Sequence, residues 1–164
     1  MEPTRPVVFQ ILPSLVVGGA ERLVVHLSRE RFAPVCICLE SPLGTHYEAR
    51  VQASGAPLHF LGKGAGASGG VLRQLSALFR QYRPAVAHTH IIGLNYAYLL
   101  MLRYRTPARV HTVHSLASRE VGVRVGAWVR QLAFRYRLGG VVLWRWRTRC
   151  GRAFSSCTAT LTRR

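Results

Sequence analysis

Histidine side chains gather at the ends of two predicted strands. His88 and His90 close one apolar run on either side of Thr89, and His114 closes the next run. A single histidine at a strand end is usually structural, whereas three at adjacent strand ends favour a functional site. His111 lies inside a predicted strand, and we expect its side chain to face a flanking helix.

A glycine pair followed by a helical pattern is the second feature with chemical potential. Gly18 and Gly19 come after the first apolar run, and Ala20 and Glu21 begin the helical pattern. Glycine lets the backbone approach a ligand, and the start of a helix favours a phosphate or a sugar rich in hydroxyl groups. The pair also suits a simple tight bend, and it lacks the Gly-x-Gly-x-x-Gly pattern that NAD binding requires. Glu21 has two open interpretations, a substrate contact or an acid stabilised in the first helical turn.

Alternating strands and helices must position these residues. Apolar runs predict strands over residues 7–12, 35–39, 58–61, 85–88 and 109–113, and amphipathic spacing predicts helices after Gly19 and over 46–53, 72–82 and 94–104. This alternation predicts an α/β fold with a doubly wound parallel sheet and helices on both faces. Ligands of such sheets bind beyond the carboxyl ends of the strands, where the strand order reverses. With the order 3-2-1-4-5, the glycine pair and the strand-end histidines would face one crevice.

Three sequence blocks, taken together, resemble the N-terminal domain of GT-B glycosyltransferases of the subfamily 4-like type. The resemblance extends over about residues 7–142. The blocks are Ile11-Leu12-Pro13 with Gly18-Gly19-Ala20-Glu21-Arg22, then Val86-Ala87-His88-Thr89-His90, and then Val110-His111-Thr112-Val113-His114. This resemblance implies a Rossmann-like domain that forms the N-terminal half of a GT-B fold.

The resemblance also implies an activity and roles for individual residues. Members of this family are retaining enzymes that transfer a sugar from a nucleotide sugar to a glycan, lipid or small-molecule acceptor. Gly18 and Gly19 then line the cleft near the donor phosphates and the acceptor. His114 matches the histidine that contacts the donor sugar, which makes it the catalytic candidate, and His88 and His90 line the acceptor side. The groups that hold the nucleotide belong to a C-terminal domain, so we expect this chain alone to be inactive.

No cofactor and no metal are expected, because the nucleotide sugar is a substrate. Cys36 and Cys38 lie two apart on a predicted strand, which places both thiols on one face as small buried groups rather than zinc ligands. A nucleotide-sugar epimerase shares the GT-B fold but lacks the Gly-Gly-Ala-Glu block. It is therefore the less favoured enzyme.

The net charge of +17 raises an alternative of another class, a small basic module that binds nucleic acid or membrane without catalysis. Of the 23 basic residues, 22 are arginine, and the chain has no aspartate, a skew typical of G+C-rich coding. No nucleic-acid motif is present, so no nucleic acid is expected as a partner. Residues 120–137 predict an amphipathic helix that carries Arg124, Arg130 and Arg135 off its apolar stripe. These arginines suit either a solvated face or contact with anionic lipid.

The last segment of the chain differs from the rest. We assign residues 1–142 to the glycosyltransferase-like domain and residues 143–164 to an aberrant basic tail. The tail can be translated back into a coding sequence with G- or C-ending codons and read again in another frame, from the third base of the Trp144 codon. That frame encodes an acidic helix start and an amphipathic helix. This result favours a shifted reading frame over a genuine basic tail. No apolar run is long enough to span a bilayer and no signal-like start is present. We therefore expect a cytoplasmic protein, with any lipid contact at the inner face of the membrane.

Overall fold

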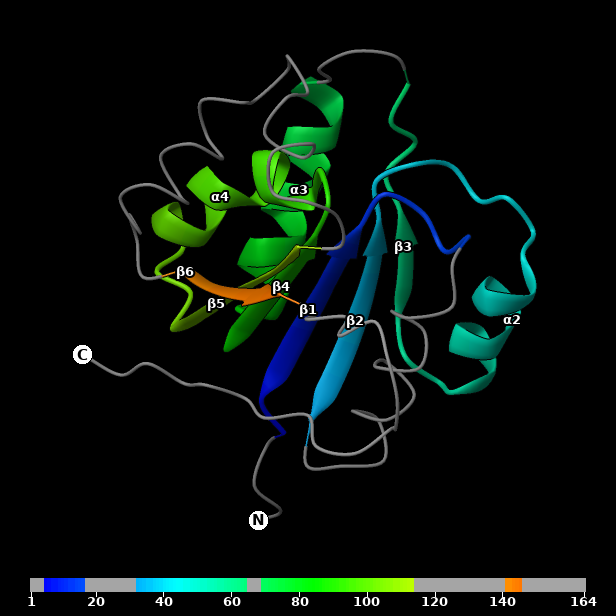
Figure 1. Cartoon of the computed structure of the whole chain (residues 1–164), viewed down its shortest axis with the longest axis horizontal. Coiled ribbons are helices and arrows are strands. Elements are labelled where there is room, and N and C mark those ends of the chain that lie inside the picture. The colour runs from blue at the N-terminus through cyan, green and yellow to red at the C-terminus, as the bar shows by residue number, and fades with distance from the viewer. Residues whose placement is uncertain (1–4, 17–31, 65–68, 114–140, 146–164) are drawn as a thin grey trace, which may run out of the picture.

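A six-stranded parallel sheet forms the centre of the molecule (Figure 1). The computed structural model describes residues 5–16, 32–64, 69–113 and 141–145 of the chain. The strand order is β3-β2-β1-β4-β5-β6, and every neighbouring pair is parallel. The strands are β1 (Val7–Leu12), β2 (Ala33–Cys38), β3 (Leu58–Phe60), β4 (Val86–His90), β5 (Ala108–Val113) and β6 (Val141–Arg145). This topology confirms the predicted doubly wound fold and the order 3-2-1-4-5.

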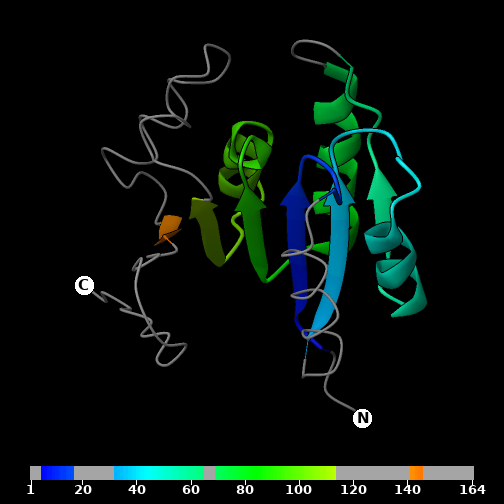
Figure 2. The same ribbon diagram turned by 45° about the vertical axis from the view of Figure 1, so that its right-hand side comes forward.

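Helices cover both faces of the sheet (Figure 2). The helices α3 (Gly69–Tyr82) and α4 (Gly93–Arg103) pack on one face, while α2 (His46–Ala53) packs on the other. The helices predicted after Gly19 and over residues 120–137 lie outside the described residues. No helix in the described part of the chain is long and apolar enough to cross a membrane.

Side chains of the central strands alternate between two apolar cores. Phe9 and Ile11 of β1 belong to the larger core, which includes α3 and α4. Cys36 and Cys38 of β2 belong to the smaller core, together with Val51 of α2. Because successive strand residues point to opposite faces, both faces of these strands are buried and the strand sequences are almost continuously apolar.

The two cysteines of β2 are free, fully buried thiols on the same face, as predicted. A hydrogen bond with Cys38 and burial both raise the pKa of the Cys36 thiol well above its ordinary value. Since the thiolate is the reactive form, Cys36 is an inert core residue at neutral pH.

Several strand boundaries differ from the sequence expectation by one or two residues, and two differences concern β4 and β6. The predicted fourth strand ended at residue 88, whereas β4 continues to His90 because its polar side chains find partners on neighbouring strands. β6 pairs in register with β5 through Arg145, so it includes the first three residues of the range that we assigned to the basic tail. Residues 146–164 lie outside the described residues, and the shifted reading frame stays a prediction.

Candidate functional site

The edge of the sheet at which the strands end, the carboxyl edge, carries a polar cluster. Its members are Gln10 of β1, His88 and His90 of β4, and Thr112 of β5. Strand register aligns Gln10 with His88 and aligns His90 with Thr112. The residues that alternate with them in β1 and β4 belong to the core under α3 and α4, so the four polar side chains lie on the opposite face.

Two hydrogen bonds orient the histidines. The His90 Nε2 atom lies 3.1 Å from the Gln10 Oε1 atom, and His90 is only 5% exposed. Since an amide oxygen can only accept, the Nε2 atom of His90 is the donor in this contact. The Nε2 atom of the half-buried His88 lies 2.6 Å from the Thr112 hydroxyl oxygen. Each imidazole is therefore held in place by a neighbouring strand.

The two imidazole rings also contact each other. Their centroids lie 4.2 Å apart, with the ring planes tilted by 40°. The Nε2 atoms of both rings are engaged with Thr112 and Gln10, and the two side-by-side imidazoles combine polar edges with flat ring faces in a small area. Such a pair suits a ligand that carries neighbouring hydroxyl groups. Among the described residues, no three histidine, cysteine, aspartate or glutamate side chains are grouped to hold a metal ion.

The opposite face of β4 and β5 carries a buried pair, Thr89 and His111. The Thr89 hydroxyl oxygen lies 2.9 Å from Nδ1 of His111 and 3.3 Å from the carbonyl oxygen of Val110. Both side chains are fully buried. His111 thus lies on the face that α3 and α4 cover, which agrees with its predicted structural role. The pair links β4 to β5 on the face opposite the polar cluster, at positions that are aligned in the strand register.

The turn after β4 is tightly constrained. Ile91 takes a left-handed backbone conformation with a φ of 49°, which is unusual for a β-branched residue. Two residues later, Gly93 begins α4 directly against the end of β1. A Cβ atom on Gly93 would lie 2.7 Å from the backbone oxygen of Ile11, so no side chain fits there. The absence of a side chain at Gly93 lets α4 start immediately beyond His90.

A second set of contacts fixes the chain as it leaves β1. The Thr45 hydroxyl donates to the carbonyl oxygen of Leu15 at 2.8 Å and accepts from the backbone N–H of Glu48 at 3.3 Å. The Glu48 carboxylate in turn accepts from the backbone N–H groups of Leu43 and Gly44, at 3.0 and 2.9 Å. The start of α2 thereby anchors the segment that leads from β1 to the glycine pair.

Comparison with protein families identifies the chain. The model of the family described as Glycosyltransferase Family 4 matches residues 17–162. The chain belongs to Glycosyltransferase Family 4. A comparison with curated protein sequences finds no match.

A solved glycosyltransferase structure agrees with this family at the level of the fold. The family 4 chain is similar to a glycosyltransferase from Rickettsia africae, with a TM-score of 0.52 and 13% sequence identity. The similarity covers 85% of this chain and 42% of the other, so this chain spans less than half the length of the Rickettsia protein. Pantothenate synthetase from Thermus thermophilus gives a TM-score of 0.41 at 20% identity, over 73% of this chain and 62% of that one.

The described part of this family 4 chain contains some of the predicted site residues. His88 and His90 come together on one face of the carboxyl edge, and their role in binding substrate stays a prediction. The other predicted site residues, which are Gly18, Gly19, Glu21 and His114, lie outside the described residues. Their place in the crevice therefore stays a prediction.

Sequence reasoning missed three residues that shape this edge, namely Gln10, Gly93 and Thr112. Gln10 had a usable signal, because it is the only polar residue in the apolar run 7–12. A buried amide inside such a strand needs a partner, and that partner is 80 residues away. The cavity found among the described residues lies at the opposite edge, between the ends of α3 and α4. The hydrogen-bonded geometry of His88 and His90 is the stronger guide to chemistry, because that cavity contains no histidine.

Proposed function

We propose that the carboxyl edge of this family 4 domain binds the acceptor of a retaining, nucleotide-sugar-dependent glycosyltransferase. The observation that carries the proposal is the His88–His90 pair, held by Gln10 and Thr112 at the edge where ligands of parallel sheets bind. A sugar, a glycan or the sugar portion of a lipid presents neighbouring hydroxyl groups. The paired ring nitrogens suit hydrogen bonding to such groups.

Fixed imidazoles favour binding because little side-chain freedom remains to be lost. His90 is buried and hydrogen-bonded, and its ring contacts His88. Ordering a mobile side chain at an interface costs about 0.5–1.5 kcal/mol, and this cost is avoided when the ring is already held. In the proposed site, Gly18 and Gly19 supply backbone N–H groups near the donor phosphates, Glu21 contacts substrate, and His114 contacts the donor sugar.

Nuclear magnetic resonance of the histidine rings tests the acceptor assignment. A panel of mono-, di- and alkyl glycosides is titrated into the full chain, and the ring signals are assigned by single substitutions. We expect a binding glycoside to shift the signals of His88 and His90 and to leave that of the exposed His46 on α2 unchanged. His88→Ala should weaken binding, whereas His46→Ala should not. A glycoside that binds without shifting His88 or His90 would contradict the assignment.

We further propose that a second domain supplies most of the donor contacts, and that this chain alone does not transfer sugar. The 42% coverage of the Rickettsia glycosyltransferase supports this idea, since that protein is more than twice as long as the matched part. An open half-cleft cannot exclude water or stabilise a leaving diphosphate. Calorimetric titration with nucleotide sugars should show no binding tighter than about millimolar, roughly −4 kcal/mol. Micromolar binding or measurable transfer would overturn this proposal.

Contact with the inner face of the cytoplasmic membrane, through Arg124, Arg130 and Arg135, is proposed from the sequence pattern alone. The three residues lie outside the described residues. Flotation with anionic and neutral vesicles tests it, and replacing all three arginines with glutamine should abolish binding to the anionic vesicles. Equal binding of the triple variant would contradict the proposal.

A further inference from the structure

Two similar junctions lie side by side at the edge where the strands begin, the amino edge. One joins α3 to β4 through Arg83 and Pro84, and the other joins α4 to β5 through Arg105 and Pro107. Both arginines take left-handed backbone conformations, with φ values of 45° and 50°. Arg83 and Arg105 are the helix-end arginines.

Each helix-end arginine occupies a helix cap that usually carries glycine. The backbone N–H of Arg83 donates to the carbonyl oxygen of Phe79 at 3.0 Å, which closes α3. At the end of α4, the backbone N–H groups of Arg105 and Thr106 donate to Leu102 and Met101, at 3.1 and 2.9 Å. Glycine is the common residue at such positions because a side chain strains a left-handed backbone. Strained residues persist where the surrounding structure holds them, and they cluster at active sites and ligand-binding sites.

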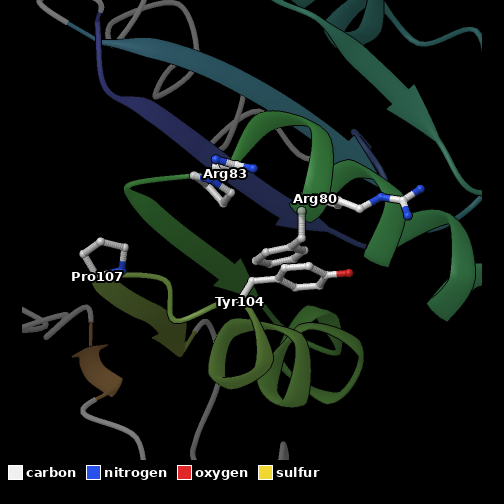
Figure 3. Close-up of a pocket in the computed structure, with 6 residues that line it drawn as sticks. Arg80, Arg83, Tyr104 and Pro107 are labelled. Atoms are coloured by element: carbon white, nitrogen blue, oxygen red, sulfur yellow. The ribbon is translucent and has the colours of Figure 1, made fainter.

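A cavity of about 370 Å³ opens between the two junctions. Its lining residues are Phe79, Arg80, Arg83, Pro84, Tyr104 and Pro107. The Phe79 and Tyr104 rings stack with centroids 5.9 Å apart, and the Tyr104 hydroxyl lies 2.7 Å from the Ser76 hydroxyl. Figure 3 shows Arg83, Tyr104 and Pro107 around the cavity, with the Arg80 side chain extending away from Pro107. The cavity thus combines an apolar wall with a guanidinium group and has the size of a small-molecule site.

Positive charge at this edge is not balanced by acidic residues in the described part of the chain. Arg80, Arg83, Arg103 and Arg105 are all exposed around the two helix ends. The acidic residues of the described ranges are Glu40 and Glu48, which follow β2 and begin α2 at the carboxyl edge. Close arginines without acidic neighbours attract anions, and the guanidinium group matches phosphate oxygens especially well.

The helix dipole explains only part of this cluster. Arg80 and Arg103 lie in the last turns of their helices, where a positive charge is favourable for the fold alone. Arg103 also lies over the Tyr104 ring, with its guanidinium carbon 5.6 Å from the ring centroid. The helix-end arginines lie beyond the last helical residue and carry a backbone strain that glycine would avoid.

We propose that this amino-edge cavity binds a phosphate group attached to an apolar or ring-shaped moiety. Arg83, which lines the cavity, contacts the phosphate, and the exposed Arg105 of the neighbouring junction adds positive charge. The moiety packs against Tyr104 and Pro107. A free phosphate ester and the headgroup of a phospholipid share this chemistry. The proposal does not depend on the proposed acceptor site, because no residue is common to the two.

Titration of the full chain with phenyl phosphate, inorganic phosphate and phenol tests the proposal by calorimetry. We expect phenyl phosphate to bind more tightly than either single-part probe, since it carries both recognised groups. The double variant Arg83→Gly, Arg105→Gly should weaken its binding by at least about tenfold, because the Arg83 contact and the neighbouring charge of Arg105 are both lost. Its thermal midpoint should equal or exceed that of the natural chain, because glycine relieves the left-handed backbone. The control Arg73→Ala removes an exposed charge at the other end of α3 and should retain binding within about twofold.

Vesicles distinguish the two sources of the phosphate. Loss of binding to vesicles containing phosphatidic acid in the double variant, with binding retained in Arg73→Ala, assigns the cavity to a lipid headgroup. Unchanged vesicle binding, together with lost phenyl phosphate binding, assigns it to a free phosphate ester. The proposal is overturned if phenyl phosphate does not bind the natural chain. Equal weakening in Arg73→Ala would also overturn it, because only the diffuse charge of the chain would then matter.

Discussion

Gly93→Ala is the sharpest test of how the carboxyl edge is built. The added Cβ atom would lie 2.7 Å from the Ile11 backbone oxygen, 3.3 Å from its carbonyl carbon and 3.4 Å from a side-chain carbon of the same residue. The first of these distances is one that real Cβ atoms essentially never show. Ile11 is paired with β2 on one side and with β4 on the other, so its carbonyl group cannot move away cheaply. The strain must instead displace the start of α4.

The magnitude follows from two opposing effects. Overpacking a close-packed site by one carbon costs about 1–3 kcal/mol, and the upper part of that range applies when the clashing atom is backbone. Alanine gains at most about 1 kcal/mol over glycine inside a helix, and less at the first helical position, where Gly93 lies. We therefore expect Gly93→Ala to lower the free energy of unfolding by about 1–2 kcal/mol.

Urea denaturation followed by circular dichroism measures this change. The matched control is Gly69→Ala, because Gly69 begins α3 as Gly93 begins α4, and a Cβ atom there meets nothing within 4 Å. The control should match the natural chain or be more stable by up to about 1 kcal/mol. If Gly93→Ala proves as stable as Gly69→Ala, the close contact between α4 and β1 is wrong.

Three further predictions concern single side chains. Burial lowers the pKa of His59, so the folded protein binds fewer protons than the unfolded chain. The thermal midpoint of the protein should therefore fall as the pH drops below about 6.5. The fall should be less steep in the variant His59→Phe. A constant midpoint between about pH 7.5 and 5 would contradict this sign. Because both thiols are fully buried and the pKa of Cys36 is raised, native alkylation, mapped by peptide mass spectrometry, should leave Cys36 and Cys38 unmodified until the chain unfolds. Gln10→Leu removes the acceptor of His90 and should cost about 1 kcal/mol, read from urea denaturation; an unchanged stability would mean that this hydrogen bond contributes nothing.

The sheet could be predicted from the sequence because its strands are buried on both faces. The run 7–12 is apolar and ends at Pro13, and the structure has β1 over the same residues. The helix α2 matches its predicted range from His46 to Ala53, since local signals determine both ends. The Thr45 side chain caps its first turn, and Gly55 takes a left-handed φ of 75° just beyond its end. Local chemistry decides such boundaries, so the sequence contains them.

The polar cluster could not be predicted in the same way. The bond between Gln10 and His90 joins residues 80 positions apart and exists only because β1 and β4 pair in one particular register. A shift of one residue would move His90 to the opposite face of the sheet. The helix-end arginines were also beyond sequence reasoning. Arg83 and Arg105 occupy positions where a left-handed cap would be expected to carry glycine.

The two faces of β4 explain how one strand can serve both the core and a site. On one face, Ala87 and Thr89 lie under the helices, and the Thr89–His111 contact ties β4 to β5. On the other face, His88 and His90 contact each other and the flanking strands. Because adjacent residues share one backbone, the position of each imidazole depends on the register that the buried pair secures. A change at Thr89 that shifted this register would therefore displace both histidines without touching either ring.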